Sequence, residues 1–253
     1  MATSEPVLTV LLYSTLAALA AALGAAPFAF GRRPHEAWIG AAYALASGFM
    51  LGAGYLLMSR GLERETLFAV LGGGGGVAYT WWTQRYPGTD RLDTRPGREI
   101  SPDVGYKTIL QSTLHSASEG VAIGVAMALD PERPYLGIFM ALALAVHNVG
   151  EGMALTDVLR QRGMTVSESA GLCVVTNVTQ PLLAVVAFAL SPSLGHFLPA
   201  ALGFSAGSLV FLVLTELAPA SYERASKTMV ATLMSVAAAA VVLLAHFFVN
   251  AGS

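Results

Sequence analysis

Apolar residues along this chain gather in eight long stretches that are separated by short polar segments. Each stretch holds 18 to 25 residues. A spanning helix needs about 20 mostly apolar residues to cross a hydrocarbon core about 30 Å thick. The pattern therefore predicts an all-α integral membrane protein with eight transmembrane helices. The predicted spans are Val7–Phe30, Ala37–Met58, Thr66–Thr83, Thr108–Leu129, Tyr135–Leu159, Ser169–Leu190, Phe197–Pro219 and Thr228–Val249.

Two of these stretches need separate arguments. Val7–Phe30 has the position of a signal peptide, but it lacks a basic segment before it and is longer than the usual apolar region of about 7–15 residues. We therefore expect a membrane helix there. The third stretch contains five consecutive glycines, Gly72–Gly76, and each glycine weakens a helix by about 1 kcal/mol relative to alanine. Because small residues also let membrane helices approach closely, we interpret the run as a packing surface.

The Lys and Arg residues divide unevenly between the two sides that these spans define. If the chain starts outside, 11 of the 14 fall on one side, and the positive-inside rule places that side in the cytoplasm. The eleven are Arg32, Arg33, Arg85, Arg91, Arg95, Arg98, Lys107, Arg160, Arg162, Arg224 and Lys227, and the other three are Arg60, Arg64 and Arg133. This predicts two extracytoplasmic termini, a cytoplasmic loop at 84–103 and a single transmembrane domain over residues 1–253.

Composition excludes several classes of protein. Hydrophobic residues make up 55% of the chain and charged residues only 12%, about half the charged fraction of a soluble domain. The single cysteine, Cys173, excludes an internal disulfide framework and any Cys-rich metal site. The formal net charge of -2 gives no basic surface for a nucleic acid. The expected surroundings are a lipid bilayer.

Ionisable residues inside two of the apolar stretches are the candidate chemistry. An ionisable group in the hydrocarbon region costs at least about 2.5 kcal/mol and is a functional hypothesis by default. The fourth span contains His115 and Glu119, and the fifth contains His147 and Glu151. The spacing i, i+4 puts each His and its Glu on one face of a helix.

The two His–Glu pairs lie at matched depths in the predicted membrane helices. Counted from the predicted cytoplasmic ends, His115 and Glu151 lie at nearly one level, and Glu119 and His147 lie at another. Two imidazoles and two carboxylates are a suitable ligand set for Zn²⁺, and also for Fe²⁺ or Mn²⁺. One such motif alone is equally consistent with a His–Glu hydrogen bond in a helix bundle. Two motifs at matched depth favour a metal site, because a dication neutralises the buried carboxylates.

The two motifs carry a resemblance to a known family. Both read His-x-x-x-Glu-Gly, at residues 115–120 and 147–152. With eight predicted helices and both ends outside, the chain resembles the ZIP family of divalent metal transporters. The resemblance continues at residues 179–182 (TQPL), which look like the family's Glu-Pro element, and in the seventh span at 206–208 (AGS) and 216–219 (ELAP). It therefore covers most of the chain.

The resemblance implies a centre with two metal sites. Its first site corresponds to the His and Glu pairs of both motifs, all of which are intact. Its second site corresponds to Ser116, Asn148, Gln180 and the shared Glu151. The family usually has Asn at the first of these positions and Glu at the third. We therefore expect a single-metal centre in which Ser116, Asn148 and Gln180 are hydrogen-bonding partners or weak ligands.

A second departure from the family concerns the helix backbone. The usual proline before each motif glutamate is replaced by Ser118 and Gly150. Without proline a helix keeps its backbone hydrogen bond at that position, so the family's kink is in doubt here.

Other ionisable residues lie near the ends of the predicted spans. We interpret Asp157 and Glu216 as candidates for passing metal to the cytoplasm, whereas Asp103 is more typical of a solvated helix end. Four further residues, interpreted as surface, interfacial or hydrogen-bonded groups, are Asp130, Glu132, His196 and His246.

Together these features predict a transporter that moves Zn²⁺ toward the cytoplasm by alternating access through the His₂Glu₂ site. The ligand types also serve Fe²⁺, Mn²⁺ and Cd²⁺, so the metal is left open. By resemblance, the helices that carry the metal slide as a block against the others. The compact chain is typical of a multi-pass protein of a bacterial inner membrane, and a homodimer is compatible with it.

Two other functions compete with transport. One is a transport-silent homologue that senses or buffers metal, which the altered second site keeps open. An intramembrane metal hydrolase is the second alternative, but catalytic zinc normally has three protein ligands and an open position for water. Four matched ligands leave no obvious place for that water.

Overall fold

The computed structural model describes residues 4–30, 34–85, 102–129, 131, 134–193 and 195–251. Within these ranges every regular element is a helix, as the hydrophobic pattern predicts. The elements are α1 (Ser4–Ala20), η1 (Ala21–Phe30), α2 (Glu36–Arg64), α3 (Thr66–Arg85), α4 (Pro102–Ala128), α5 (Tyr135–Gln161), α6 (Val166–Thr176), α7 (Thr179–Leu190), η2 (Gly195–Phe197), α8 (Leu198–Leu212), η3 (Val213–Leu217), α9 (Ala218–Arg224) and α10 (Lys227–Ala251).

Helical segments occur at all eight predicted positions, and six of them in the described ranges are long and apolar enough to cross a membrane. The six are Glu5–Phe30, Glu36–Arg64, Tyr135–Gln161, Val166–Leu190, Gly195–Arg224 and Lys227–Phe247. Helices α3 and α4 are less apolar, because α3 contains the glycine run and α4 contains the polar motif. That α3 and α4 also span the membrane stays a prediction.

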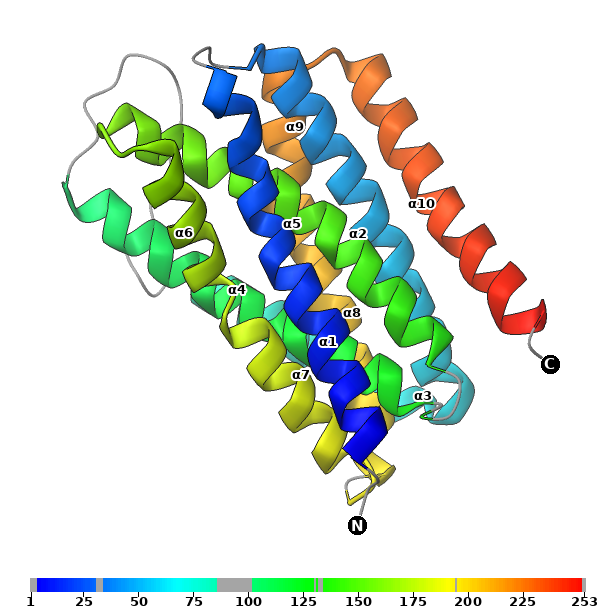
Figure 1. The fold of residues 1–253 in the computed structure, drawn as a ribbon. Helices are drawn as coiled ribbons and strands as arrows, with labels where there is room; N and C mark the ends of the chain where they lie inside the picture. The colour runs from blue at the N-terminus through cyan, green and yellow to red at the C-terminus, as the bar shows by residue number, and fades with distance from the viewer. Residues whose placement is uncertain are drawn as a thin grey trace.

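The helices form two groups that meet along α2 and α5. Helices α4 and α5 pack on each other and on α1, α6 and α7, while α3 packs on α8 and α2 packs on α8 and α10. Contacts of α2 with α5 and of α4 with α8 join the groups. In Figure 1, α1 begins and α10 finishes toward the same end of the bundle. This arrangement fits an even number of passes through the bundle.

The apolar side chains are divided as expected for a bundle in lipid. Large residues such as Met50, Leu144 and Leu202 are fully buried between helices. Others, such as Leu71 in α3 and Leu243 in α10, are exposed on the outer surface. Apolar surface of this extent favours a lipid environment over water.

The sixth predicted span is interrupted. Helix α6 ends at Thr176 and α7 begins at Thr179. The cause is Pro181, whose ring lacks an N–H and would clash with the carbonyl of Asn177 in a continuous helix. The backbone N–H of Gln180 donates to the carbonyl of Asn177 instead (3.1 Å). The break places three polar residues, Asn177, Thr179 and Gln180, at a helix junction.

The seventh predicted span contains one π-helical turn, η3, over Val213–Leu217. The backbone N–H of Ala218 donates to the carbonyl of Val213, five residues earlier. Pro219 follows directly and cannot donate to a carbonyl in the preceding turn. Such turns occur frequently at functional sites, and this one carries Glu216.

The glycine run in α3 is a packing surface, as predicted. A Cβ atom at Gly72 or Gly76 would overlap the backbone of α8 at Ala200 or Phe204. Gly74, by contrast, has open space around it. The run therefore brings the backbones of α3 and α8 together with only part of its glycines.

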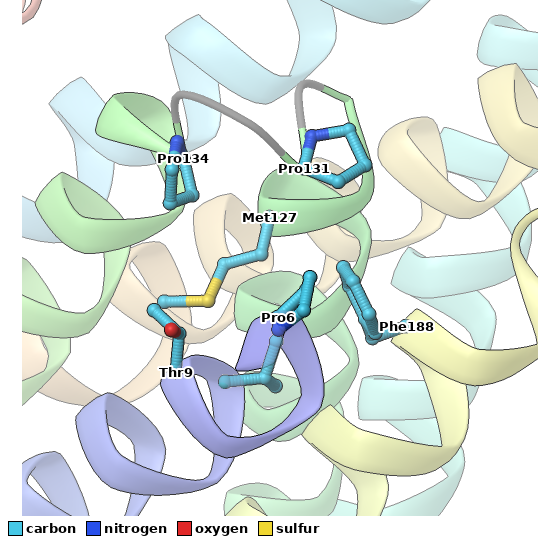
Figure 2. A pocket seen from close by; sticks show the side chains of 7 residues that line it. Pro6, Thr9, Met127, Pro131, Pro134 and Phe188 are labelled. Carbon is cyan, nitrogen blue, oxygen red and sulfur yellow. The ribbon is translucent and has the colours of Figure 1, made fainter. Parts of the chain in front are cut away.

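A small cavity lies near the extracytoplasmic end predicted for α4. It is lined by Pro6, Thr9, Val10, Met127, Pro131, Pro134 and Phe188, most of which Figure 2 labels. Its volume of about 10 Å³ leaves room for no more than one water molecule. None of its lining residues belongs to the two His–Glu motifs.

Candidate metal centre

Helices α4 and α5 bring the two motifs together. Both helices are continuous through the motifs. Ser118 and Gly150, which replace the family's prolines, therefore do not interrupt them. The glycine that follows each glutamate allows a neighbouring helix to pack closely against the motif. A Cβ atom at Gly120 would overlap the backbone of Gln180 in α7, and one at Gly152 would overlap that of Ala21 in η1.

Three of the predicted ligands form a compact cluster. The Oε1 atom of Glu119 lies 3.0 Å from His147 Nε2 and 3.2 Å from His115 Nε2. The two imidazole rings are tilted by 58° with their centroids 5.6 Å apart. One ligand atom from each residue lies within 4.8 Å of the others, which is a suitable spacing for a metal ion between them. Glu119 and His147 are buried, and His115 is 12% exposed.

Glu151 lies at the edge of this cluster rather than within it. Its Oε2 atom is 4.0 Å from His147 Nε2, and its side chain is 19% exposed. Its other oxygen, Oε1, accepts a hydrogen bond from the hydroxyl of Ser112 in α4. The structure thus gathers three of the four predicted ligands closely and leaves the fourth at the edge of the cluster.

Two residues of the expected second site, Asn148 and Gln180, form a buried network of neutral groups. Asn148 Nδ2 donates to the carbonyl of Ala17 (2.8 Å) and to Gln180 Oε1 (3.0 Å). Gln180 Nε2 in turn donates to Glu119 Oε2 (3.3 Å). Ser116, Asn148 and Gln180 are fully buried. The amide of Gln180 therefore connects this network to the His–Glu cluster.

Several polar atoms of the centre are buried without a hydrogen-bond partner in the described part of the chain. They are Ser116 Oγ, Glu119 Oε1, His147 Nδ1 and Nε2, Asn148 Oδ1 and Glu151 Oε2. The Glu119 oxygen lies close to both imidazoles, but these contacts do not have the geometry of hydrogen bonds. A buried polar atom normally has a partner, and Glu119 Oε1, which lies beside both imidazoles, is the kind of atom that binds a cation.

Comparison with known proteins bears directly on this centre. The family model for the ZIP zinc transporter matches residues 98–245, which is more than half of the chain. The chain belongs to the ZIP zinc transporter family. Together with the apolar helices, this membership makes it a multi-pass membrane protein. It also favours transport over the intramembrane hydrolase that the sequence left open.

Three relatives carry zinc-transport names. A protein of Arabidopsis thaliana named for zinc transport is 32% identical over 245 residues, which cover 95% of this chain and 39% of the relative. The zinc transporter GufA of Myxococcus xanthus is 32% identical over 117 residues, covering 45% of this chain and 44% of the relative. The zinc transporter ZIPB of Bordetella bronchiseptica is 30% identical over 120 residues, covering 47% and 38%. The matched residues thus span less than half the length of each relative.

The two residues that the sequence predicts to pass metal to the cytoplasm lie outside the cluster. Glu216 is half-buried in η3 and accepts a hydrogen bond from Gln84 Nε2 of α3 (2.8 Å). Asp157 is buried in α5, one to two turns beyond Glu151, and accepts a hydrogen bond from Gln161 Nε2 (3.3 Å).

Of the five remaining ionisable side chains, the structure describes two. His196 is exposed in η2, and His246 is exposed in α10, in agreement with a surface or interfacial position. Asp130, Glu132 and the side chain of Asp103 lie outside what the structure describes.

Sequence reasoning missed Ser112 and Gln84. Ser112 precedes His115 by three residues and Ser116 by four, so helical spacing alone puts it on the motif face. That signal was available. Gln84 is at the end of α3, and its hydrogen bonds to Thr215 (2.7 Å) and Glu216 depend on how α3 packs on α8 and η3. No local pattern indicates them.

Proposed function

We propose that this ZIP-family chain carries Zn²⁺ across the membrane toward the cytoplasm, by alternating access through a site formed by His115, Glu119, His147 and Glu151. The observation that carries the proposal is the cluster of two imidazoles and a carboxylate within 4.8 Å, buried in a bundle of membrane helices. Two of its ligand atoms, Glu119 Oε1 and His147 Nε2, have no hydrogen-bond partner among the described residues.

The ligand chemistry supports a dication as the substrate. Zn²⁺ binds imidazole nitrogen and carboxylate oxygen at about 2.0–2.2 Å. Binding neutralises the carboxylates, which removes much of the penalty of keeping charge in the membrane. Fe²⁺, Mn²⁺ and Cd²⁺ are further candidate substrates because they accept the same ligand types. The names of the relatives favour Zn²⁺.

The centre holds one metal ion at a time in this proposal. Ser116, Asn148 and Gln180 stand at the positions of the family's second site and carry no charge. The Asn148 and Gln180 amides already donate hydrogen bonds to Ala17 and Glu119. They therefore support the ligands rather than bind a second ion.

The proposed path continues to the cytoplasm through Glu216 and Asp157. The π-helical turn around Glu216 supports such a role, since backbone irregularities of this kind accompany functional sites. The 11 to 3 division of basic residues supports eight spans with both termini outside. The group α1 and α4–α7 then slides against α2, α3 and α8–α10 as one transmembrane domain. A bacterial inner membrane and a homodimer stay predictions.

Metal flux into proteoliposomes tests the proposal. The purified chain is reconstituted as wild type, His147→Ala and Glu151→Ala, and influx of Zn²⁺, Cd²⁺, Fe²⁺ and Mn²⁺ is measured. We expect wild-type Zn²⁺ influx and background flux in both variants, because each removes a ligand. His196→Ala and Glu223→Ala are matched controls at exposed positions and should keep wild-type flux.

Two outcomes would contradict transport through this centre. Wild-type flux in His147→Ala and Glu151→Ala would remove the site from the pathway. Tight metal binding by the wild type without flux would instead identify a transport-silent homologue that senses or buffers metal.

A further inference from the structure

Each glutamate of the centre has one oxygen engaged by a neutral donor and one oxygen turned to the histidines. Glu119 accepts from Gln180 Nε2 at Oε2 (3.3 Å), while its Oε1 faces both imidazoles. Glu151 accepts from the Ser112 hydroxyl at Oε1, while its Oε2 lies 4.0 Å from His147 Nε2. The two free oxygens have no hydrogen-bond partner among the described residues. The same division of roles thus occurs twice, through unrelated donors.

The Gln180 donor is fixed by the network behind it. A backbone carbonyl can only accept, so the contact of Asn148 with Ala17 O identifies the amide nitrogen of Asn148. That nitrogen also faces Gln180, which must present its oxygen to Asn148 and its nitrogen to Glu119. Both amides are fully buried, so neither can turn toward water instead.

We propose that Ser112 and Gln180 determine metal specificity by restricting each glutamate to one ligand oxygen, so that the centre favours Zn²⁺ over Mn²⁺. This inference rests on the proposed function of the same site. Two imidazole nitrogens and two single oxygens make a four-coordinate set, which is the usual coordination of Zn²⁺ in proteins. Mn²⁺ prefers about six oxygen ligands and gains from carboxylates that offer both oxygens.

The physical reason is the position of the donor hydrogens. A hydroxyl or amide hydrogen on one carboxylate oxygen places positive charge beside it, which opposes a cation there and fixes the rotation of the group. Without that donor the carboxylate is free to turn and present both oxygens. Partners that orient ligands in this way typically change metal affinity or activity by about 10–100-fold when they are removed.

The variants that test this are Ser112→Ala and Gln180→Met, each of which removes one donor and keeps the side chain similar in size. Ser118→Ala is the matched control for the first, because Ser118 is also buried in α4 but donates to the backbone oxygen of His115 (2.9 Å). Thr179→Ala is the control for the second, because the Thr179 hydroxyl donates to the backbone oxygen of Thr113 (2.9 Å). Ser112→Thr keeps the hydroxyl and should restore wild-type behaviour.

Two readouts are compared. In proteoliposomes, the ratio of kcat/KM for Zn²⁺ to that for Mn²⁺ should fall about tenfold or more in both variants, mainly through a higher KM for Zn²⁺, and stay unchanged in both controls. X-ray absorption of the purified, Zn²⁺-loaded protein should give four nitrogen and oxygen neighbours in the wild type. In the variants the number should rise to five or six, with longer mean distances.

The proposal is overturned if Ser112→Ala and Gln180→Met keep the wild-type ratio and four neighbours, or if Zn²⁺ and Mn²⁺ transport fall by the same factor without a change in coordination. Wild-type protein without any flux would defeat the proposed function instead. The absorption measurement would then still decide whether the two donors set the coordination number.

Discussion

Gln180 is one of the positions at which this chain departs from the pattern that the family resemblance implies. The resemblance implies a glutamate at this position, where this chain has an amide that donates to Glu119 Oε2. An amide supplies a hydrogen and no charge, whereas a carboxylate supplies charge and no hydrogen. In the proposed centre, Gln180 supports a ligand of one metal ion, whereas a glutamate at this position could bind a second ion. The two side chains differ by a single atom.

Restoring the carboxylate should restore the second site. Gln180→Glu would place a second acidic group beside Glu119, and a second dication is the partner that relieves their repulsion. We expect the purified wild type to bind one Zn²⁺ per chain and Gln180→Glu to bind two, measured by elemental analysis after removal of excess metal. Gln180→Met should stay at one. A ratio of one in Gln180→Glu would show that Ser116 and Asn148 cannot complete a second site.

Individual residues of the centre differ in how far the sequence predicts them. The i, i+4 spacing and matched depth place Glu119 beside His147, and their 3.0 Å contact confirms this. The same helical face also indicates Ser112, which lies three residues before His115. The edge position of Glu151 could not be predicted, because it depends on which way a flexible side chain turns toward a neighbouring helix. Gln180 is identified through the resemblance and not through spacing.

Helix boundaries in this protein follow from capping residues and prolines. Helix α6 begins at Val166, three residues before the predicted span, because Thr165 and Glu168 form a capping box. The break before α7 and the π-helical turn in η3 each accompany a proline, Pro181 or Pro219. Proline therefore indicates an irregularity near that position, but its form, a break or a wide turn, depends on the packing of the surrounding helices. The 3₁₀ helix η1 likewise contains a proline, Pro27.

The glycines beside the site glutamates should differ in their tolerance of substitution. In Gly120→Ala the new Cβ would overlap the backbone of Gln180, so α4 and α7 must separate. We expect the free energy of unfolding in detergent to fall by about 1–3 kcal/mol, together with a loss of flux. Gly150→Ala is the matched control, because its Cβ would meet Ala46 Cβ at an ordinary 3.6 Å. Equal unfolding of the two variants would argue against tight packing of α4 on α7.

Orientation in the membrane is a property of the whole molecule, and charge rather than packing predicts it. In Figure 1 the first helix begins and the last helix finishes toward one end of the bundle, which fits eight passes. Helix packing is the same whichever side of the membrane that end faces. Only the division of Lys and Arg between loops carries that information.

Cysteine labelling tests the orientation without removing the native cysteine, because Cys173 is fully buried. Cysteines are introduced at two exposed positions at opposite ends of the bundle, Ser193→Cys between α7 and α8 and Ser167→Cys near the start of α6. In intact cells a membrane-impermeant maleimide should label position 193 and leave position 167 unlabelled until the membrane is opened. The reverse pattern would invert the topology and the proposed direction of transport.

Helix α1 and the adjoining η1 contribute contacts to the metal centre from outside the segment that carries its ligands. All four candidate ligands lie within residues 98–245, the part that the family model matches, but α1 and η1 precede it. Ala17 supplies the acceptor that orients Asn148, and Ala21 packs against Gly152. A fragment that begins after α3 would keep every candidate ligand yet lose the group that orients the amide chain leading to Glu119. The ligand-bearing segment is therefore not a portable module, since residues nearly a hundred positions upstream of the first ligand maintain its geometry.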